Sequence, residues 1–344
     1  MKHPPKNINL FIIVFFAVSI AIQLAMLAVL AISIYSRVVS TDRAMSIVLF
    51  MAALMNPLCA VYLLLLAFDV FHALWVWWRN RCWEKTITRD AEGLISGAAA
   101  YTLEGACPQA PRTAILFIHG FNDTPQAWQL LAPRVHELTR ATCRVMRLPG
   151  IAEPLREQHK TSLEQWLNAI HIEVARLRTC HEKVFIAGHS LGGGLALLAT
   201  RESFTLKVDG LILLSPLIRA RKKHTRLFAL TDRVLSFTKT CKTPFPNPIQ
   251  TKDGRVYDYA RDRYVSFAVF RAMFNMTRHL VASRDTCHKA LVFVSERDRL
   301  IDTPAVARFL PNARIITTDK AGHALALDAG WEERAEEIAR FVQS

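Results

Sequence analysis

The sequence predicts an α/β fold, in which helices cover both faces of a mostly parallel sheet, with a large insertion and an N-terminal helical hairpin. Three observations predict it. Short aliphatic strands alternate with helices over residues 84–344, the segment 219–289 separates two of these strands, and two uncharged apolar runs, 9–35 and 46–68, come first. Strands buried on both faces are continuous aliphatic runs, which indicates parallel pairing between two layers of helices.

Each predicted strand is a short aliphatic run, and each predicted helix has apolar residues on one face. We expect strands at 112–119, 141–149, 183–190, 210–217, 290–298 and 313–319, and an antiparallel edge strand within 93–103. We expect helices at 123–138, 161–180, 191–201, 303–310 and 331–342. Thr161 and Glu164 have the three-residue spacing of a capping box at the start of one helix.

The N-terminal region has the composition of a membrane anchor. A bilayer span needs about 20 apolar residues, and both 9–35 and 46–68 exceed this length without a charge. A cleavable signal peptide has a shorter apolar region. The tryptophans and arginines of 69–83 are typical of a membrane–water interface. We therefore expect residues 1–83 to form a two-helix transmembrane hairpin with an interfacial segment.

The charges beside the two runs predict the orientation. Six basic side chains lie before the first run and after the second, against two in the linker. Basic residues favour the cytoplasmic side, so both ends are expected there. We expect an integral protein of a bacterial inner membrane with domain 84–344 in the cytoplasm, and the opposite topology stays open.

The seven cysteines are scattered, with no C-x-x-C pair and no cysteine–histidine cluster at zinc spacing. This pattern favours free thiols in a reducing compartment and predicts no metal site. Six of them pairing as disulfides in an oxidising compartment stays the alternative.

A G-x-S-x-G pentapeptide, Gly188-His189-Ser190-Leu191-Gly192, joins a predicted strand to a predicted helix. A serine on such a sharp turn stands clear of the sheet, and its small neighbours allow the turn to close. The helix N-terminus also presents free amides to a developing oxyanion. The pattern predicts that Ser190 is a nucleophile.

A nucleophilic serine needs a histidine base and an acid that orients the base. Asp298 follows the strand at 290–298, and His323 follows the strand at 313–319, in the order that this fold requires. Glu296 and Asp302 are rival candidates for the acid.

Two backbone amides are expected to form the oxyanion hole. One belongs to Leu191, directly after the nucleophile, and the other to Phe121, in the loop after the strand at 112–119. We interpret His119 as a residue that holds this loop by hydrogen bonding, and His189 as packing or pocket wall.

These motifs resemble the α/β-hydrolase superfamily, and within it the monoacylglycerol lipase, carboxylesterase and lysophospholipase group, which shares a domain type with the serine aminopeptidases. The resemblance covers roughly residues 90–344 and is carried by the H-G-F loop, G-H-S-L-G-G, E-R-D and G-H. It implies the triad Ser190, Asp298 and His323. The segment Leu148–Ile151 departs from the Gly-His-Gly-type turn of many relatives.

We interpret the insertion 219–289 as a cap, because a structureless loop of this length is improbable. Four aromatic residues within it recur near helical spacing and would either dock on the core or wall an acyl pocket: Tyr264, Phe267, Phe270 and Phe274. The insertion has 16 Lys and Arg against 5 Asp and Glu, a net charge of +11 out of +14 for the chain. No nucleic-acid-binding module accompanies this charge, so we expect anionic lipid headgroups as its partner, with a merely solvated basic face as the alternative.

The sequence thus predicts a membrane-anchored serine hydrolase of lipid-like carboxylic esters, monoacylglycerols or lysophospholipids, with no metal and no cofactor. A peptidase of aminopeptidase type is the first alternative, although a cap that recognises a free amino terminus needs acids and this one is basic. A non-catalytic membrane scaffold is the second.

Overall fold

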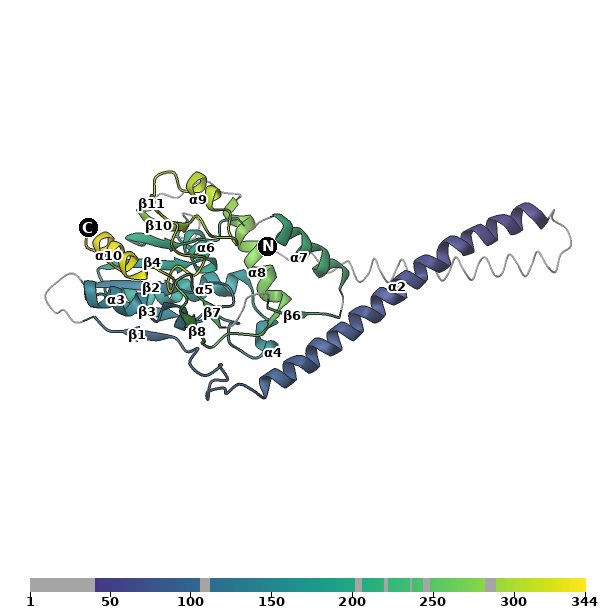
Figure 1. Cartoon of the computed structure of the whole chain (residues 1–344), viewed down its shortest axis with the longest axis horizontal. Coiled ribbons are helices and arrows are strands. Elements are labelled where there is room, and N and C mark those ends of the chain that lie inside the picture. Colours follow the sequence, from purple (N-terminus) through teal and green to yellow (C-terminus); the bar gives the residue numbers. More distant parts are fainter. Residues whose placement is uncertain are drawn as a thin grey trace. The chain divides into compact units, whose positions relative to one another are not determined.

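The computed structural model describes residues 41–105, 112–201, 206–219, 222–235, 237–243, 248–281 and 289–344. The chain divides into two compact units. The first comprises Met1–Trp75 with Ala229–Thr238, and the second comprises Val76–Phe228 with Lys239–Ser344. The second unit contains the sheet (Figure 1). All of the predicted site residues belong to this unit. The predicted boundary between residues 83 and 84 stays a prediction.

The main sheet of the second unit has the strand order β1-β3-β2-β4-β5-β10-β11. Its strands are β1 (Tyr101–Leu103), β2 (Thr113–Ile118), β3 (Thr142–Met146), β4 (Lys183–His189), β5 (Gly210–Leu214), β10 (Ala290–Ser295) and β11 (Arg314–Thr318). β1 pairs with β3 in the antiparallel sense and the other neighbours are parallel. The predicted α/β fold, its mostly parallel sheet and its antiparallel edge strand are confirmed.

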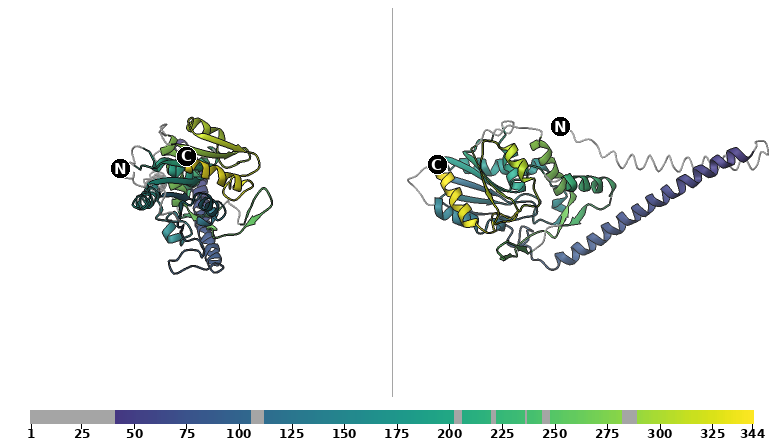
Figure 2. Two further views of the ribbon diagram at one scale, coloured as in Figure 1. Left: turned by 90° about the vertical axis from the view of Figure 1, so that its left-hand side faces the viewer. Right: turned by 45° about the horizontal axis from the view of Figure 1, so that its top comes forward.

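Helices cover both faces of this sheet. α3 (Leu131–Thr139), preceded by the 3-10 turn η1 (Pro125–Trp128), packs side by side with α10 (Trp331–Gln343) on one face (Figures 1 and 2). α5 (Leu163–Arg178), α6 (Leu191–Ala199) and α8 (Phe267–Val281) pack on the other, and α9 (Thr303–Phe309) adds to the same core. Along β2, Leu116 faces the α5–α6 side and Phe117 faces the α3–α10 side, which is why the strands are apolar throughout.

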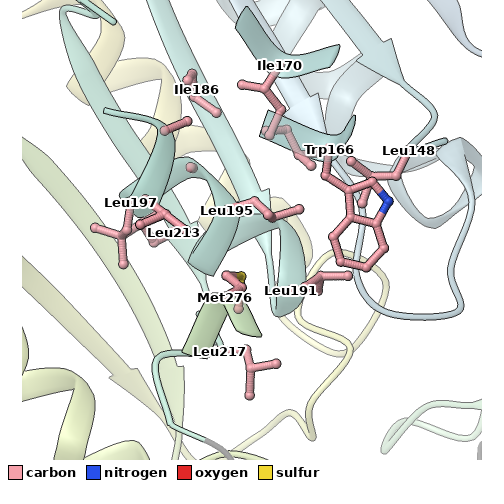
Figure 3. Close-up of a cluster of buried hydrophobic side chains, with 14 of the residues drawn as sticks. Leu148, Trp166, Ile170, Ile186, Leu191, Leu195, Leu197, Leu213, Leu217 and Met276 are labelled. Atoms are coloured by element: carbon pink, nitrogen blue, oxygen red, sulfur yellow. The ribbon is translucent and has the colours of Figure 1, made fainter. Parts of the chain in front are cut away.

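The core beneath α6 supports the end of β4. Leu191 and Leu195 of α6 lie beside Trp166 of α5 and Met276 of α8 (Figure 3). All four side chains are fully buried. Burying large apolar side chains contributes about 1.5–3 kcal/mol each, so the start of α6 is a well-anchored part of the fold.

The predicted insertion has secondary structure of its own. It contains α7 (Lys222–Val234), the paired strands β6 (Thr240–Lys242) and β9 (Tyr264–Ser266), the paired strands β7 (Ile249–Gln250) and β8 (Val256–Tyr257), and α8. Tyr264 and Phe267 are buried, whereas Phe270 and Phe274 are half-buried and lie 5.4 Å and 5.0 Å from the ring of Phe228. The aromatic residues therefore divide between docking on the core and lining a partly open surface.

The membrane prediction is overturned. In the part of the chain that the structure describes, no helix is long and apolar enough to cross a membrane, which contradicts the predicted integral membrane location. The run 9–35 lies outside the described residues, and the run 46–68 lies within α2 (Thr41–Glu84). Asp69, expected at a membrane–water interface, is instead buried in the first unit.

Asp69 makes hydrogen bonds that a hydropathy count does not include. The Asp69 carboxylate accepts the amides of Phe237 at 2.8 Å and Thr238 at 2.9 Å. A buried carboxylate needs such donors, and these come from a segment 168 residues further along the chain.

The structure also bears on the predicted capping box, on the cysteines and on one helix that was not predicted. The capping box of α5 is made by Ser162 and Gln165, one residue later than the predicted Thr161 and Glu164. Among the described cysteines, four are free thiols: Cys82, Cys143, Cys180 and Cys241. α4 (Leu155–Gln158), a short helix before α5, was not predicted.

Candidate active site

Ser190 lies at the sharp turn between the end of β4 and the start of α6. Its backbone has φ 51° and ψ −111°, in a region that residues with side chains rarely adopt. The Ser190 amide donates to the Leu214 carbonyl at 2.9 Å, and the Ser190 carbonyl accepts the amides of Gly194 at 3.1 Å and Leu217 at 2.8 Å. These bonds to β5, to the segment after it and to α6 hold the strained turn in place.

The two glycines of the pentapeptide occupy positions without room for a side chain. A Cβ on Gly188 would lie 2.5 Å from the carbonyl oxygen of Gly192. A Cβ on Gly192 would overlap the carbonyl oxygen of Ile118, at the end of β2. The motif spacing therefore follows from the close approach of β4, α6 and β2.

His323 lies between Ser190 and Asp298. Its Nε2 is 2.9 Å from Ser190 Oγ, and its Nδ1 is 2.7 Å from Asp298 Oδ2. An ionised carboxylate only accepts hydrogen bonds, so Nδ1 carries the proton and Nε2 accepts the serine hydroxyl. A histidine in this tautomer is able to take the proton of the serine.

The environment of Asp298 keeps it charged. Burial on its own raises the pKa of Asp298, but the hydrogen bond and charge of His323 and two backbone amides outweigh it, so the pKa is lowered from its usual value. The amides belong to Leu300, at 2.8 Å from Oδ1, and Ile301, at 3.3 Å.

The two rival acids lie elsewhere. The Glu296 side chain is exposed, and Asp302 is the residue before α9. The structure thus brings Ser190, His323 and Asp298 together in one hydrogen-bonded chain.

The loop after β2, Gly120–Asn122, passes directly beside Ser190. A Cβ on Gly120 would lie 3.4 Å from Ser190 Cβ and 3.0 Å from His189 Nδ1, which leaves little room for any side chain. Phe121 is buried, with its ring 4.7 Å from that of Phe270. The predicted oxyanion residues, Phe121 and Leu191, therefore belong to the two segments that flank Ser190.

Residues of the insertion hold this loop, and the sequence analysis missed them. The Tyr259 hydroxyl donates to Asp123 Oδ1 at 2.5 Å, and Arg261 Nε donates to the Asn122 carbonyl at 2.8 Å. Asn122, with φ 53°, donates its side-chain amide to the Asp262 carbonyl at 3.1 Å. These partners are up to 140 residues apart in sequence, so no local pattern signals them.

His119 holds the Gly120–Asn122 loop by hydrogen bonding, as predicted. Its Nε2 accepts the Leu148 amide at 3.0 Å, so Nδ1 carries the proton and donates to the Gly120 carbonyl at 2.9 Å. Burial lowers the pKa of His119 to about 4, which keeps the ring neutral. The segment Leu148–Ile151, where the sequence departs from many relatives, is tied to the loop in this way.

Three successive residues of the loop that carries His323 are held by hydrogen bonds, two of them from β10 and β4 and one from Asp328 of the same loop. Ser295 Oγ donates to the Ala321 carbonyl at 2.6 Å, and the Gly322 amide donates to Asp328 Oδ2 at 2.6 Å. The His323 carbonyl accepts from His189 Nε2 at 2.9 Å. Within the described residues, no group of three or more His, Cys, Asp or Glu side chains is arranged to hold a metal ion.

Solved structures of lipases resemble this chain. A metagenome-derived lipolytic enzyme, LipS or LipT, is 17% identical with a TM-score of 0.63, and the match covers 73% of this chain and 99% of that one. A monoacylglycerol lipase of Paleococcus ferrophilus is 17% identical with a TM-score of 0.57, covering 71% and 98%. A monoglyceride lipase of Saccharomyces cerevisiae is 14% identical with a TM-score of 0.59, covering 71% and 90%.

At these identities the likeness shows the fold alone. No curated protein matches the sequence. The family model described as the alpha/beta hydrolase family matches residues 115–341, which include Ser190, Asp298 and His323. The resemblance predicted from the motifs is confirmed, and the chain belongs to the alpha/beta hydrolase family.

Proposed function

We propose that this protein is a serine hydrolase that cleaves carboxylic esters through an acyl-enzyme on Ser190. The favoured substrates are acyl glycerols or lysophospholipids. The observation that carries the proposal is the hydrogen-bonded chain from Ser190 Oγ through His323 to Asp298, at a strained turn in a family of hydrolases.

The chemistry follows from the tautomer of His323. Ser190 Oγ attacks the ester carbonyl carbon while His323 Nε2 takes the hydroxyl proton, and Asp298 stabilises the imidazolium that forms. The tetrahedral intermediate collapses, the carbon–oxygen bond of the ester breaks, and His323 returns the proton to the leaving alcohol. Water, deprotonated by His323, then releases the acyl group as a carboxylic acid and restores Ser190.

The oxyanion of the intermediate would accept hydrogen bonds from the amides of Phe121 and Leu191. The proximity of the Phe121 loop to Ser190 and the position of Leu191 at the start of α6 support this assignment. Losing one such donor typically costs about 10²-fold to 10³-fold in kcat.

A cluster of phenylalanines supports a lipid-like acyl group. The rings of Phe121 and Phe270 are 4.7 Å apart, and Phe228 lies 5.4 Å from Phe270 and 5.0 Å from Phe274. This chain of aromatic rings starts at the residue proposed as an oxyanion donor. An apolar chain bound along it would have its carbonyl near Ser190.

The charge of the insertion supports contact with anionic lipid headgroups. Basic residues near such a surface gain about 1 kcal/mol each. Lys242, the last residue of β6, and Arg263, the residue before β9, are both exposed. Replacing both by Glu should reduce sedimentation with vesicles of phosphatidylcholine and phosphatidylserine, while binding to pure phosphatidylcholine vesicles should be weak for both proteins. Equal binding of variant and wild type would contradict this partner.

Labelling with a fluorophosphonate probe tests the nucleophile. Wild type should be labelled and Ser190→Ala should not, and equal labelling would overturn the proposal.

Hydrolysis of p-nitrophenyl esters of increasing chain length, beside aminoacyl anilides, tests the substrate class. Faster turnover of the anilides would favour a peptidase, and no labelling of a folded wild type would favour a non-catalytic role.

A further inference from the structure

His189 immediately precedes the proposed nucleophile, and the mechanism above leaves it without a role. It is buried, with its ring centroid 5.0 Å from that of His323 and 6.5 Å from that of Trp128. Its Nε2 lies 2.9 Å from the carbonyl oxygen of His323, not from its ring nitrogens. The contact therefore acts on the main chain of the proposed base.

The proton on this ring can be assigned. A carbonyl oxygen only accepts, so His189 Nε2 must carry a proton and donate it. Burial, and next the charge of His323, lower the pKa of His189 to about 4, so the ring is neutral and Nδ1 is unprotonated at neutral pH. His189 is thus a fixed donor.

An alternative is that His189 and Asp123 form a second ion pair near the serine. His189 Nδ1 and Asp123 Oδ2 are 3.8 Å apart, too far for a hydrogen bond. The other oxygen of Asp123 is held by Tyr259 at 2.5 Å. A neutral His189 has no charge to offer this carboxylate, so the geometry favours the bond to His323.

The loop that carries His323 has other hydrogen bonds, and the bond from His189 differs from them in the element that it reaches. Ser295, at the end of β10, holds Ala321 and so ties the loop to the strand that precedes Asp298. The Leu325 amide also donates to the His323 carbonyl at 2.9 Å, but it belongs to the same loop and moves with it. His189 ties His323 to β4, which ends next to Ser190.

We propose that His189 is a positioning residue, whose Nε2–H fixes the main-chain carbonyl of His323 and thereby the distance from His323 Nε2 to Ser190 Oγ. The inference rests on the proposed ester hydrolysis and deepens it. Because the donor and the nucleophile are adjacent residues on one turn, base and nucleophile are held to the same rigid element. A misplacement of about 1 Å between reacting groups costs about 10²-fold in rate.

The test compares His189→Gln with His189→Met, which have similar length but differ in the donor. A third variant, His189→Phe, keeps an aromatic ring against Trp128 and has no donor. Each is assayed on a p-nitrophenyl ester for kcat and KM, and by urea unfolding for stability, with Ser190→Ala as the blank.

Positioning and packing predict opposite orders. If His189 positions His323, Met and Phe should each lower kcat by about 10-fold to 100-fold with KM unchanged, and Gln should recover most of the loss. If His189 only fills space, Met should equal or exceed Gln in both stability and kcat, because a buried amide is costlier than a thioether.

The second order would overturn the inference while leaving ester hydrolysis intact. Gln and Met variants of equal kcat would do the same. A folded wild type without Ser190-dependent turnover would instead remove the proposed function, and this inference with it.

Discussion

The hydroxyl of Tyr259 donates to Oδ1 of Asp123 at 2.5 Å, which joins the insertion to the loop after β2. Both residues are buried, and Arg261 Nε lies 3.5 Å from the same oxygen. Asp123 is two residues from Phe121, so the insertion is bonded to the loop that carries a proposed oxyanion donor.

Replacing Tyr259 by Phe removes the donor and leaves a buried carboxylate short of a partner. We expect the free energy of unfolding to fall by about 1–3 kcal/mol, and kcat on an ester to fall because the loop loosens. Urea unfolding and steady-state kinetics measure the two effects. Tyr257→Phe, at a half-buried position on β8, is the matched control. It removes a hydrogen bond to the exposed Arg255, so it should change stability by less than about 0.5 kcal/mol and leave kcat unchanged. A Tyr259→Phe protein as stable as wild type would contradict the prediction.

Asp298→Asn should lower kcat by about 10⁴-fold, because the amide supports the wrong tautomer of the base. Glu296→Gln and Asp302→Asn should leave kcat near wild type, since His323 bonds to Asp298 at 2.7 Å. Steady-state kinetics on a p-nitrophenyl ester compare the three. A large loss in either rival, with Asp298→Asn active, would move the acid to that rival.

Asp262 should make stability depend on pH. Burial raises the pKa of Asp262 to about 7, although the Ala152 amide at 2.7 Å and Arg89 act in the opposite sense. Between pH about 4 and 7 the folded protein therefore keeps a proton that the unfolded chain has released. The contribution of Asp262 to the free energy of unfolding falls as pH rises through this window, by up to about 1.4 kcal/mol per pH unit.

The measurement for Asp262 is a difference, because other buried groups also titrate in this window. Urea unfolding of wild type and Asp262→Asn at several pH values should show wild type losing stability relative to the variant from pH about 4 to 7, and no further change above. Asp258→Asn, at an exposed position, is the control. A pH-independent difference for Asp262→Asn would refute the assignment.

Ser162 should stabilise the start of α5. Its hydroxyl accepts the Gln165 amide at 3.2 Å, and Gln165 Oε1 accepts the Ser162 amide at 3.1 Å. Ser162→Ala should cost about 1 kcal/mol. Thr161→Val should change stability by less than about 0.5 kcal/mol, because the Thr161 hydroxyl has no hydrogen-bond partner among the described residues. Thermal unfolding distinguishes the two, and the reverse order would restore the register predicted from sequence.

Hydrophobic periodicity predicted the presence of most strands and helices, but not where each of them begins and ends. The aliphatic runs at 183–190 and 210–217 are β4 and β5, and the expected helix at 191–201 is α6. The expected helix at 123–138 is broken into η1 and α3, and its first turn starts at Pro125. Boundaries depend on side-chain bonds such as the cap of Ser162, which periodicity does not contain.

The membrane prediction was wrong for the described residues, in which no helix is long and apolar enough to cross a membrane. Hydropathy also does not predict the partners of Asp69, which are the amides of Phe237 and Thr238. The proposed contact with anionic lipid headgroups rests on the charge of the insertion, which is +11 of the chain's +14.

By itself the sequence determined the alternation of strands and helices, the family, and Ser190, Asp298 and His323 as candidates, because each depends on neighbours within a few residues. Only the tertiary structure decided which acid bonds to His323, which donors hold its loop, and that Tyr259 and Arg261 of the insertion brace the loop of Phe121. Most of those contacts join residues more than 100 positions apart, and the acid had to be distinguished from two other carboxylates a few residues away. Both depend on distance and direction in space and not on residue type.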